Sequence, residues 1–258
     1  LWRLLAKALG SATRFVFRGA QELDPTHQRD GIAFFLFILA LIAAAGTWFN
    51  LDNFLICFMD VFEAIETRRA IKKFDPTYKM SQIDVKKLME HVILAPTSYN
   101  QQNWRFVIST DQDIKEKISI AARGQAQPKD GSLVVVLCGN MDAWKTEPLR
   151  YWKNHPSEKQ ETVKAALERK YDGNPQNLRD EAVRSCGMAA QTIMLAAKQM
   201  GLDSCPMVGF EYDELANVIN LPENHMIVMM VVVGKRAQDA SQRGGQLSLD
   251  EVVFENKF

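Results

Sequence analysis

An excess of charge of one sign is what this sequence most clearly lacks, because 31 lysines and arginines balance 31 aspartates and glutamates. Bulk charge therefore gives no support to a nucleic-acid or anionic-membrane partner, which would require a basic surface. Cysteine is also scarce. The cysteines form no CxxC pair and have no histidine at a zinc-binding spacing, which indicates reduced thiols rather than disulfides or a metal site. The four are Cys57, Cys138, Cys186 and Cys205.

Two further absences narrow the chemistry. No GxGxxG loop is present, so the sequence has no motif for the pyrophosphate of a dinucleotide. His91, His155 and His225 are isolated, and no Ser-His-Asp arrangement indicates nucleophilic catalysis. Each of these histidines is expected to be an ordinary core or surface residue.

Residues 31–51, GIAFFLFILALIAAAGTWFNL, form one long apolar run with no charge between Asp30 and Asp52. At ~1.5 Å per residue such a helix spans about 30 Å, the thickness of a bilayer core. Trp48 and Phe49 fit an interfacial position at one end. The run is too long, and starts too late, for a cleavable signal peptide. We therefore predict a transmembrane helix over residues 31–51.

The residues around this apolar run support two different interpretations of it, a fused leader and a native membrane anchor. Basic residues outnumber acidic ones before it, which favours a cytoplasmic N-terminus and would place the following domain outside the cell. Residues 24–31 and the apolar run also resemble the first membrane segment of bacterial septal DNA translocases. We therefore expect residues 1–58 to be a fused leader and residues 59–258 a complete cytoplasmic domain that starts at Met59. The alternative is a native anchor that holds the domain at the membrane through residues 31–51.

From Met59 onward, hydrophobic patterning predicts helices that alternate irregularly with a few strands. Apolar Val61, Phe62 and Ile65 share one face of the first helix, and Ser81 is placed to cap the second. The predicted helices are residues 60–69, 81–95, 111–122, 158–171 and 178–200. The predicted strands are residues 105–110 and the valine-rich runs 133–139 and 227–233. The fold class is α+β, a mostly antiparallel sheet surrounded by helices.

Two segments suit a large, planar, polar ligand that also carries a phosphate. Arg68-Arg69-Ala70-Ile71-Lys72-Lys73-Phe74 gathers cations at the end of the first helix. In a helical turn, Arg68 and Lys72 would lie four residues apart on one side. The second segment, Ala95-Pro96-Thr97-Ser98-Tyr99-Asn100-Gln101-Gln102-Asn103-Trp104-Arg105-Phe106, is a hydroxyl- and amide-rich loop ahead of a strand. Its amides can both donate and accept hydrogen bonds, as the ring of such a ligand requires.

A third segment, Cys205-Pro206-Met207-Val208-Gly209-Phe210, follows the longest predicted helix. Gly209 has no Cβ, so a ligand can approach the backbone closely there. Taken alone, a turn that leads into a helix at Glu211 would explain this run equally well.

In this order, the three segments resemble the signature segments of the nitroreductase family, dimeric FMN enzymes that take hydride from NAD(P)H. The resemblance covers residues 59–258 and implies that Arg68 contacts the phosphate and Lys72 the flavin edge. Ala70 stands where the family usually has Ser. The loop is implied to contact the flavin across the dimer interface, and the N–H groups before and at Gly209 to face flavin N5 and O4. The residues so implied to bind FMN are Arg68, Arg69, Ala70, Lys72, Pro96, Thr97, Ser98, Asn100, Gln102, Pro206, Met207, Val208 and Gly209.

The phosphate requires a further cation. Arg243 aligns best with the family's C-terminal phosphate clamp, and its planar fork suits a phosphate, while Lys235 and Arg236 are alternatives. Gln125 stands where the family contacts the flavin ring, although Gly124 departs from the family pattern. Two interpretations stay open for three aromatic residues of the polar excursion at residues 140–179, which would either line the pocket over the flavin or pack the excursion itself. They are Trp144, Tyr151 and Trp152.

The resemblance implies an oxidoreductase that transfers hydride from NADH or NADPH through FMN to an electron-poor acceptor such as a nitroaromatic or a quinone. The cofactor carries this chemistry, so we expect no catalytic side chain and no metal. The implied assembly is a homodimer, with a small-molecule acceptor as its other partner. Two alternatives remain, a membrane-anchored reductive dehalogenase of the same fold and a non-catalytic flavin-binding module. The sequence does not distinguish NADH from NADPH and does not identify the physiological acceptor.

Overall fold

The computed structural model describes residues 59–258. The leader at residues 1–58, its predicted transmembrane helix and its resemblance to a translocase segment lie outside the described residues and stay predictions. Within residues 59–258, no helix combines the length and the apolar composition that crossing a membrane requires.

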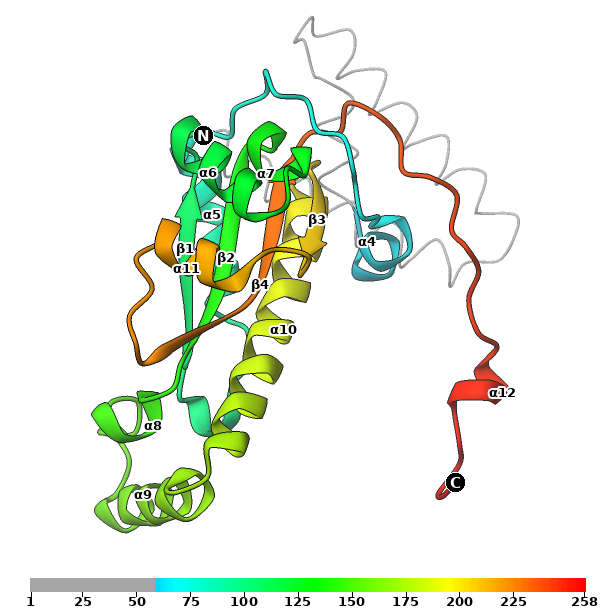
Figure 1. Ribbon diagram of the computed structural model, residues 1–258. Helices are drawn as coiled ribbons and strands as arrows, with labels where there is room; N and C mark the ends of the chain where they lie inside the picture. The colour runs from blue at the N-terminus through cyan, green and yellow to red at the C-terminus, as the bar shows by residue number, and fades with distance from the viewer. Residues whose placement is uncertain (1–58) are drawn as a thin grey trace, which may run out of the picture. The chain divides into compact units, whose positions relative to one another are not determined.

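A four-stranded antiparallel sheet forms the centre of the described chain (Figure 1). Its strands lie in the order β1 (Trp104–Ser109), β2 (Leu133–Asn140), β4 (His225–Gly234) and β3 (Asp203–Met207). The runs predicted as strands form β1, β2 and β4, and β2 is buried along its length except at Asn140. Continuous burial means that both faces of the sheet are covered, as the unbroken valine-rich sequence predicts.

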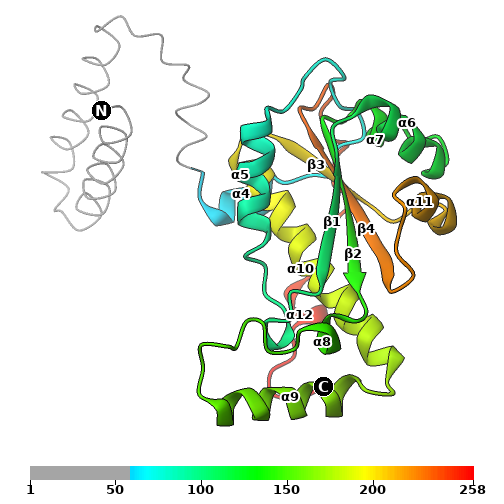
Figure 2. The same ribbon diagram turned by 90° about the vertical axis from the view of Figure 1, so that its left-hand side faces the viewer.

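Helices cover the two faces of the sheet in separate layers (Figure 2). On one face, α5 (Gln82–Val92) and α10 (Pro175–Gln199) pack against Val135 and Leu137. On the other, α6 (Gln112–Ala121) and α11 (Tyr212–Val218) pack against Val134 and Val136. Alternate side chains of β2 therefore enter opposite layers of the core. This arrangement confirms the predicted α+β class with an antiparallel sheet among helices.

Local signals set several of the helix ends. The side chains of Ser81 and Asp111 accept hydrogen bonds from the N–H groups of Asp84 and Ile114, which caps α5 and α6. The long helix α10 stops just before Gly201, whose positive φ of 71° ends the helical path. The described chain also contains α7 (Ala126–Asp130), α8 (Ala143–Thr146), α9 (Ser157–Tyr171), α12 (Leu249–Val252) and the 3₁₀ helix η1 (Ser98–Asn100).

The predicted helix at residues 60–69 is shorter than the sequence indicated, because α4 (Val61–Thr67) ends before the basic segment. Arg68 is already extended, with φ −61° and ψ 131°. The Ile71 N–H donates to the Ser204 carbonyl at 3.0 Å, and Ile71 and Phe74 are buried. Burial of these two side chains draws the segment along the outer edge of β3. The prediction that Arg68 and Lys72 share a helical turn is therefore wrong.

The apolar face of α4 does not enter the core of this chain. Val61, Phe62 and Ile65 are 67%, 75% and 46% exposed, and only Ala64 of α4 is buried. The amphipathic pattern is present as predicted, but its apolar side faces outward. Large apolar residues of the C-terminal segment are also exposed, among them Leu247, Leu249, Val252, Val253, Phe254 and Phe258.

Strand β3 was not predicted, although it covers the start of the third motif. It is short, lies at the edge of the sheet and contains Pro206, so its sequence carries no alternating pattern. The long excursion between β2 and α10 holds α8 and α9 around a small apolar cluster that includes Leu167 and Tyr171. Trp144 and Trp152 pack against this cluster, which shows that they do pack the excursion.

Candidate functional site

A strongly cationic hollow of about 370 Å³ lies between the basic segment and the chain that follows β4. Its lining includes Arg68, Arg69, Lys72 and Arg243 and no acidic side chain. Ala70 also lines it, with small and polar residues from 240–246. Four cations with no carboxylate in the lining make this hollow suited to a phosphate or another compact anion.

Two arginines hold the walls of this hollow together. Arg69 Nη2 donates to the Ser241 carbonyl. Arg243 Nη2 donates to the carbonyls of Glu66 at 2.8 Å and Arg68 at 3.2 Å. The first of these carbonyls lies in the last turn of α4, where carbonyls lack helical partners. Arg243 therefore fixes the C-terminal segment against the basic segment and keeps further N–H donors for a ligand.

The two alternative phosphate cations do not line this hollow. Lys235 Nζ lies 5.0 Å from the centre of the Tyr78 ring. Arg236 Nε pairs with Asp203 at 3.8 Å and with Asp239 at 3.1 Å. Of the three candidates, Arg243 alone lines the hollow.

The third motif continues from the basic segment along β3. Lys72 Nζ lies 3.9 Å from Cys205 Sγ, which joins the two motifs at the outer edge of the sheet. Burial raises the pKa of the Cys205 thiol and the nearby Lys72 opposes that shift, so this cysteine is held as the neutral thiol. Pro206 is half-buried and Met207 is buried at the end of the strand.

Backbone donors are free where β3 ends. Val208 and Gly209 are exposed, and neither N–H donates to another group of residues 59–258. Gln125 Nε2 donates to the Gly209 carbonyl at 2.7 Å and to the Ala122 carbonyl at 3.0 Å. A Cβ at position 209 would meet only that amide, at 3.6 Å. The structure thus brings Gln125 beside the third motif and leaves two adjacent N–H donors facing outward.

The amide loop, residues 97–102, has an unusual backbone. Tyr99, Asn100 and Gln102 have φ values of 53°, 51° and 48°. A left-handed conformation costs a residue other than glycine about 1–2 kcal/mol, with asparagine the best tolerated of the three. The loop nevertheless keeps this shape, and Thr97 Oγ accepts a hydrogen bond from the Gln102 N–H at 2.9 Å.

Side chains outside the set implied to bind FMN hold this loop in place. Trp152 Nε1 donates to the Tyr99 carbonyl at 3.0 Å, and Gln101 Nε2 donates to the Tyr171 hydroxyl at 3.1 Å. Glu181 of α10 and Lys170 of α9 contact Ser98. The position of Glu181 in the helical pattern is a signal that could have identified it from the sequence. Glu181 lies on the same side of the long helix as the buried residues Ala182, Ser185, Cys186 and Ala189, where a charge is unexpected.

The two halves of the predicted site lie at opposite ends of α10. The amide loop contacts Glu181 near the start of the helix, whereas Ala70 pairs with Ser204 just beyond the end of the helix. Between Glu181 and Gln199 the helix is about 27 Å long at ~1.5 Å per residue. Figure 1 shows α10 extending from α9 to β3. One chain therefore does not bring the amide loop to the cationic hollow.

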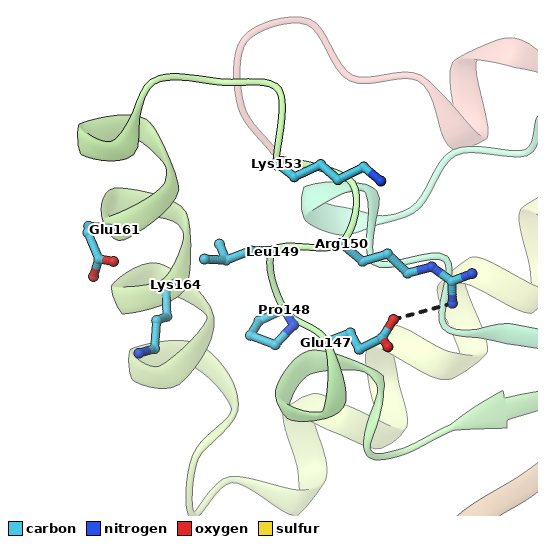
Figure 3. Close-up of a pocket in the computed structure, with 7 residues that line it drawn as sticks. All are labelled: Glu147, Pro148, Leu149, Arg150, Lys153, Glu161 and Lys164. Carbon is cyan, nitrogen blue, oxygen red and sulfur yellow. Dashed lines mark ion pairs between the residues drawn. The ribbon is translucent and has the colours of Figure 1, made fainter.

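Another hollow, of about 470 Å³, lies between α9 and the loop at residues 147–153 (Figure 3). Pro148 and Leu149 supply its apolar wall, and the Glu147–Arg150 ion pair of 3.5 Å lies at its side. None of the residues implied to bind FMN lines it. Tyr151, which is 38% exposed, lines a separate hollow with Gln101 and Arg105.

Sequence comparison relates this chain to known proteins over most of the described region. A model of the nitroreductase family matches residues 65–235. DrgA of Synechocystis is 45% identical over 182 residues, which cover 70% of this chain and 87% of DrgA. The oxygen-insensitive NADPH nitroreductase of Helicobacter pylori is 27% identical over 202 residues, or 74% of this chain and 95% of that protein.

Structural comparison agrees with the sequence. A protein from Exiguobacterium sibiricum, solved in complex with FMN, superposes with a TM-score of 0.69 at 25% identity. The match covers 76% of this chain and 97% of that protein. The shared region includes the sheet and all three motifs, since the matched family extends from α4 to the end of β4.

Proposed function

The chain belongs to the nitroreductase family and is an NAD(P)H-dependent oxidoreductase of that type, and we propose that it uses FMN to reduce electron-poor acceptors such as nitroaromatics or quinones. The observation that best supports FMN is the set of donors at the two ends of β3. Four cations without a carboxylate lie at one end, and the unpaired N–H groups of Val208 and Gly209 lie at the other. An anionic phosphate and the polar edge of a planar ring require this combination of donors.

The residues present fit the cofactor, and different residues would bind its phosphate and its ring. Arg68, Arg69 and Arg243 would hold the phosphate, and Lys72 would supply positive charge at the ring edge. Val208 and Gly209 would donate their N–H groups to the ring, with Gln125 keeping the glycine carbonyl turned away from it. Bound FMN supplies the acceptance and release of hydride, so the protein binds, orients and shields the reactants.

We further propose that two copies of this chain form a homodimer and complete each other's sites. The amide loop and the cationic hollow lie at opposite ends of a stretch of α10 that is about 27 Å long at ~1.5 Å per residue, so one chain does not bring the two together around a single cofactor. The outward apolar face of α4 and the exposed Val183 and Met188 of α10 give the chain apolar surface to bury against a second copy. The amide loop would then contact the flavin bound to the partner.

Purified full-length protein tests this function directly. We expect it to release FMN and not FAD, to lose its flavin absorbance when NADH or NADPH is added without air, and to regain it with a nitroaromatic or quinone. Release of FAD, or no flavin uptake when FMN is supplied, would contradict the cofactor assignment. Bound flavin that NAD(P)H does not bleach would instead favour a non-catalytic flavin-binding module. Faster turnover with a halogenated substrate would favour the dehalogenase. A monomer in sedimentation that still binds FMN tightly would exclude the shared site.

A further inference from the structure

Glu181 is a charged residue in a place where charge is costly. It lies on the buried face of α10, and only 5% of its surface is exposed. A carboxylate that leaves water at such a position must be paired and hydrogen-bonded, otherwise it destabilises the fold. Its partners therefore indicate what the residue is for.

The partners of Glu181 connect α10 to the amide loop. Oε1 accepts from the Ser98 N–H at 3.3 Å, and Oε2 lies 3.4 Å from Lys170 Nζ. Lys170 in turn donates to Ser98 Oγ at 3.1 Å. The three residues form a closed triangle in which both the backbone and the side chain of Ser98 are held. Arg184 Nη1 also lies 3.4 Å from Oε2.

The surroundings keep Lys170 in its charged form. Burial alone would lower the pKa of Lys170, but hydrogen bonding and attraction to Tyr171 and Glu181 outweigh it, so this pKa is raised. Its Nζ also lies 5.0 Å from the centre of the Tyr171 ring and 5.7 Å from that of Tyr99. The ammonium thus contacts the loop on both sides of the Ser98–Tyr99 peptide.

A strained loop requires such external support. The left-handed backbone at Tyr99, Asn100 and Gln102 persists only where neighbouring groups over-determine it. The bonds inside the loop, such as Gln102 N–H to Thr97 Oγ, move with the loop and cannot fix its position. Glu181 belongs to a 25-residue helix packed against the sheet, so its contact with Ser98 ties the loop to the rigid core.

We propose that Glu181, together with Lys170, is a positioning residue that fixes the amide loop in the conformation that binds the flavin of the partner subunit. This role rests on the proposed function, since it concerns a loop that contacts FMN. Glu181 acts by holding Ser98, and through Ser98 the hydroxyl and amide groups that follow.

The substitution Glu181→Gln in the full-length protein tests this role. Gln keeps the shape and an oxygen for the Ser98 N–H but presents an amide group to Lys170. The matched control is Asp180→Asn, the same loss of charge one residue earlier on α10, at a half-buried side chain that contacts Gln176 and Arg184 rather than the loop. Amide hydrogen exchange at residues 98–102 is measured without flavin, and the dissociation constants for FMN and riboflavin are measured by titration.

We expect Glu181→Gln to speed exchange of the loop amides and to weaken FMN and riboflavin binding by the same factor, about fivefold to tenfold. The control should leave both measurements unchanged. Lys170→Met should have a similar effect, and the double variant should be no worse than the poorer single variant, because the two side chains act as one unit.

Two outcomes would overturn the proposal. Unchanged loop exchange in Glu181→Gln would show that the carboxylate does not hold the loop. Faster exchange with unchanged flavin affinity would show that the contact is structural only. Failure of the wild-type protein to bind FMN would refute the proposed function instead, and exchange in the flavin-free protein would still decide whether Glu181 fixes the loop.

Discussion

The cationic hollow and the amide loop are built in opposite ways. The hollow is formed by two extended segments that Arg69 and Arg243 join, and the lining residue with a positive φ, 127°, is Gly245. The amide loop places three non-glycine residues in left-handed conformations and is held by side chains from α9, α10 and residue 152.

This difference corresponds to what each region would recognise. A phosphate is a compact charge, and several flexible cations can satisfy it without a fixed backbone. A planar ring edge presents donors and acceptors at set positions, so its partners must be preorganised. We infer that charge supplies affinity at the hollow and that shape supplies it at the loop. Comparing the affinity for FMN with the affinity for riboflavin, which lacks the phosphate, separates the contributions of charge and shape.

The largest effect is expected for Arg68→Ala. Loss of a charge-assisted contact to phosphate costs about 1.5–3 kcal/mol, so FMN affinity should fall about tenfold to a hundredfold. Riboflavin affinity should be unchanged, because no phosphate is present to lose a partner. Titration of apo-protein with each flavin measures both constants.

Lys73→Ala is the control for this prediction. It removes a cation from the same segment, but Lys73 is exposed and does not line the hollow. An unchanged FMN dissociation constant for Arg68→Ala would mean that the basic segment is only a solvated surface. Equal losses for FMN and riboflavin would mean that Arg68 contacts the ring instead.

The residue types of both regions can be read from the sequence, but their geometry cannot. The amide groups of residues 97–102 and the cations of residues 68–72 are visible in the sequence, and so are the valine-rich strands. The prediction of a helical turn at Arg68 was wrong because local periodicity does not indicate that Ile71 and Phe74 are buried against the edge of the sheet. The contacts of Ser98 with Lys170 and Glu181 span 72 and 83 residues, so no local pattern could reveal them.

A smaller effect is expected for Thr97→Val. Val keeps the shape but leaves the Gln102 N–H without the oxygen that it now reaches at 2.9 Å, which costs about 1 kcal/mol. Because the loop is proposed to contact the ring and not the phosphate, affinities for FMN and riboflavin should fall together, by about fivefold. Thr162→Val is the control, since that exposed hydroxyl donates only to the Glu158 carbonyl within α9. A loss confined to FMN would contradict the division between charge and shape.

Salt should produce a still smaller and selective effect. The hollow is open to solvent, so a rise from 0.05 to 0.5 M sodium chloride should screen its cations and weaken FMN binding by about threefold. Riboflavin binding should hardly change. The salt dependence for FMN should also be smaller in Arg68→Ala, because one screened cation is already absent. Equal salt dependence for the two flavins would show that the hollow does not hold the phosphate.

The smallest effect is expected from removal of residues 1–58. The cationic hollow, the amide loop and the core clusters described above are built from residues after Met59. A leader inserted with its arginine-rich end inside the cell would also separate the flavin domain from NAD(P)H. We therefore expect deletion to leave FMN affinity and NAD(P)H oxidation within about twofold, a difference of roughly 0.4 kcal/mol. Full-length protein in the membrane fraction, with the shortened protein active, would identify residues 31–51 as an anchor. Loss of folding or of flavin binding on deletion would show instead that residues 1–58 are an integral part of the enzyme and that the boundary at Met59 is wrong.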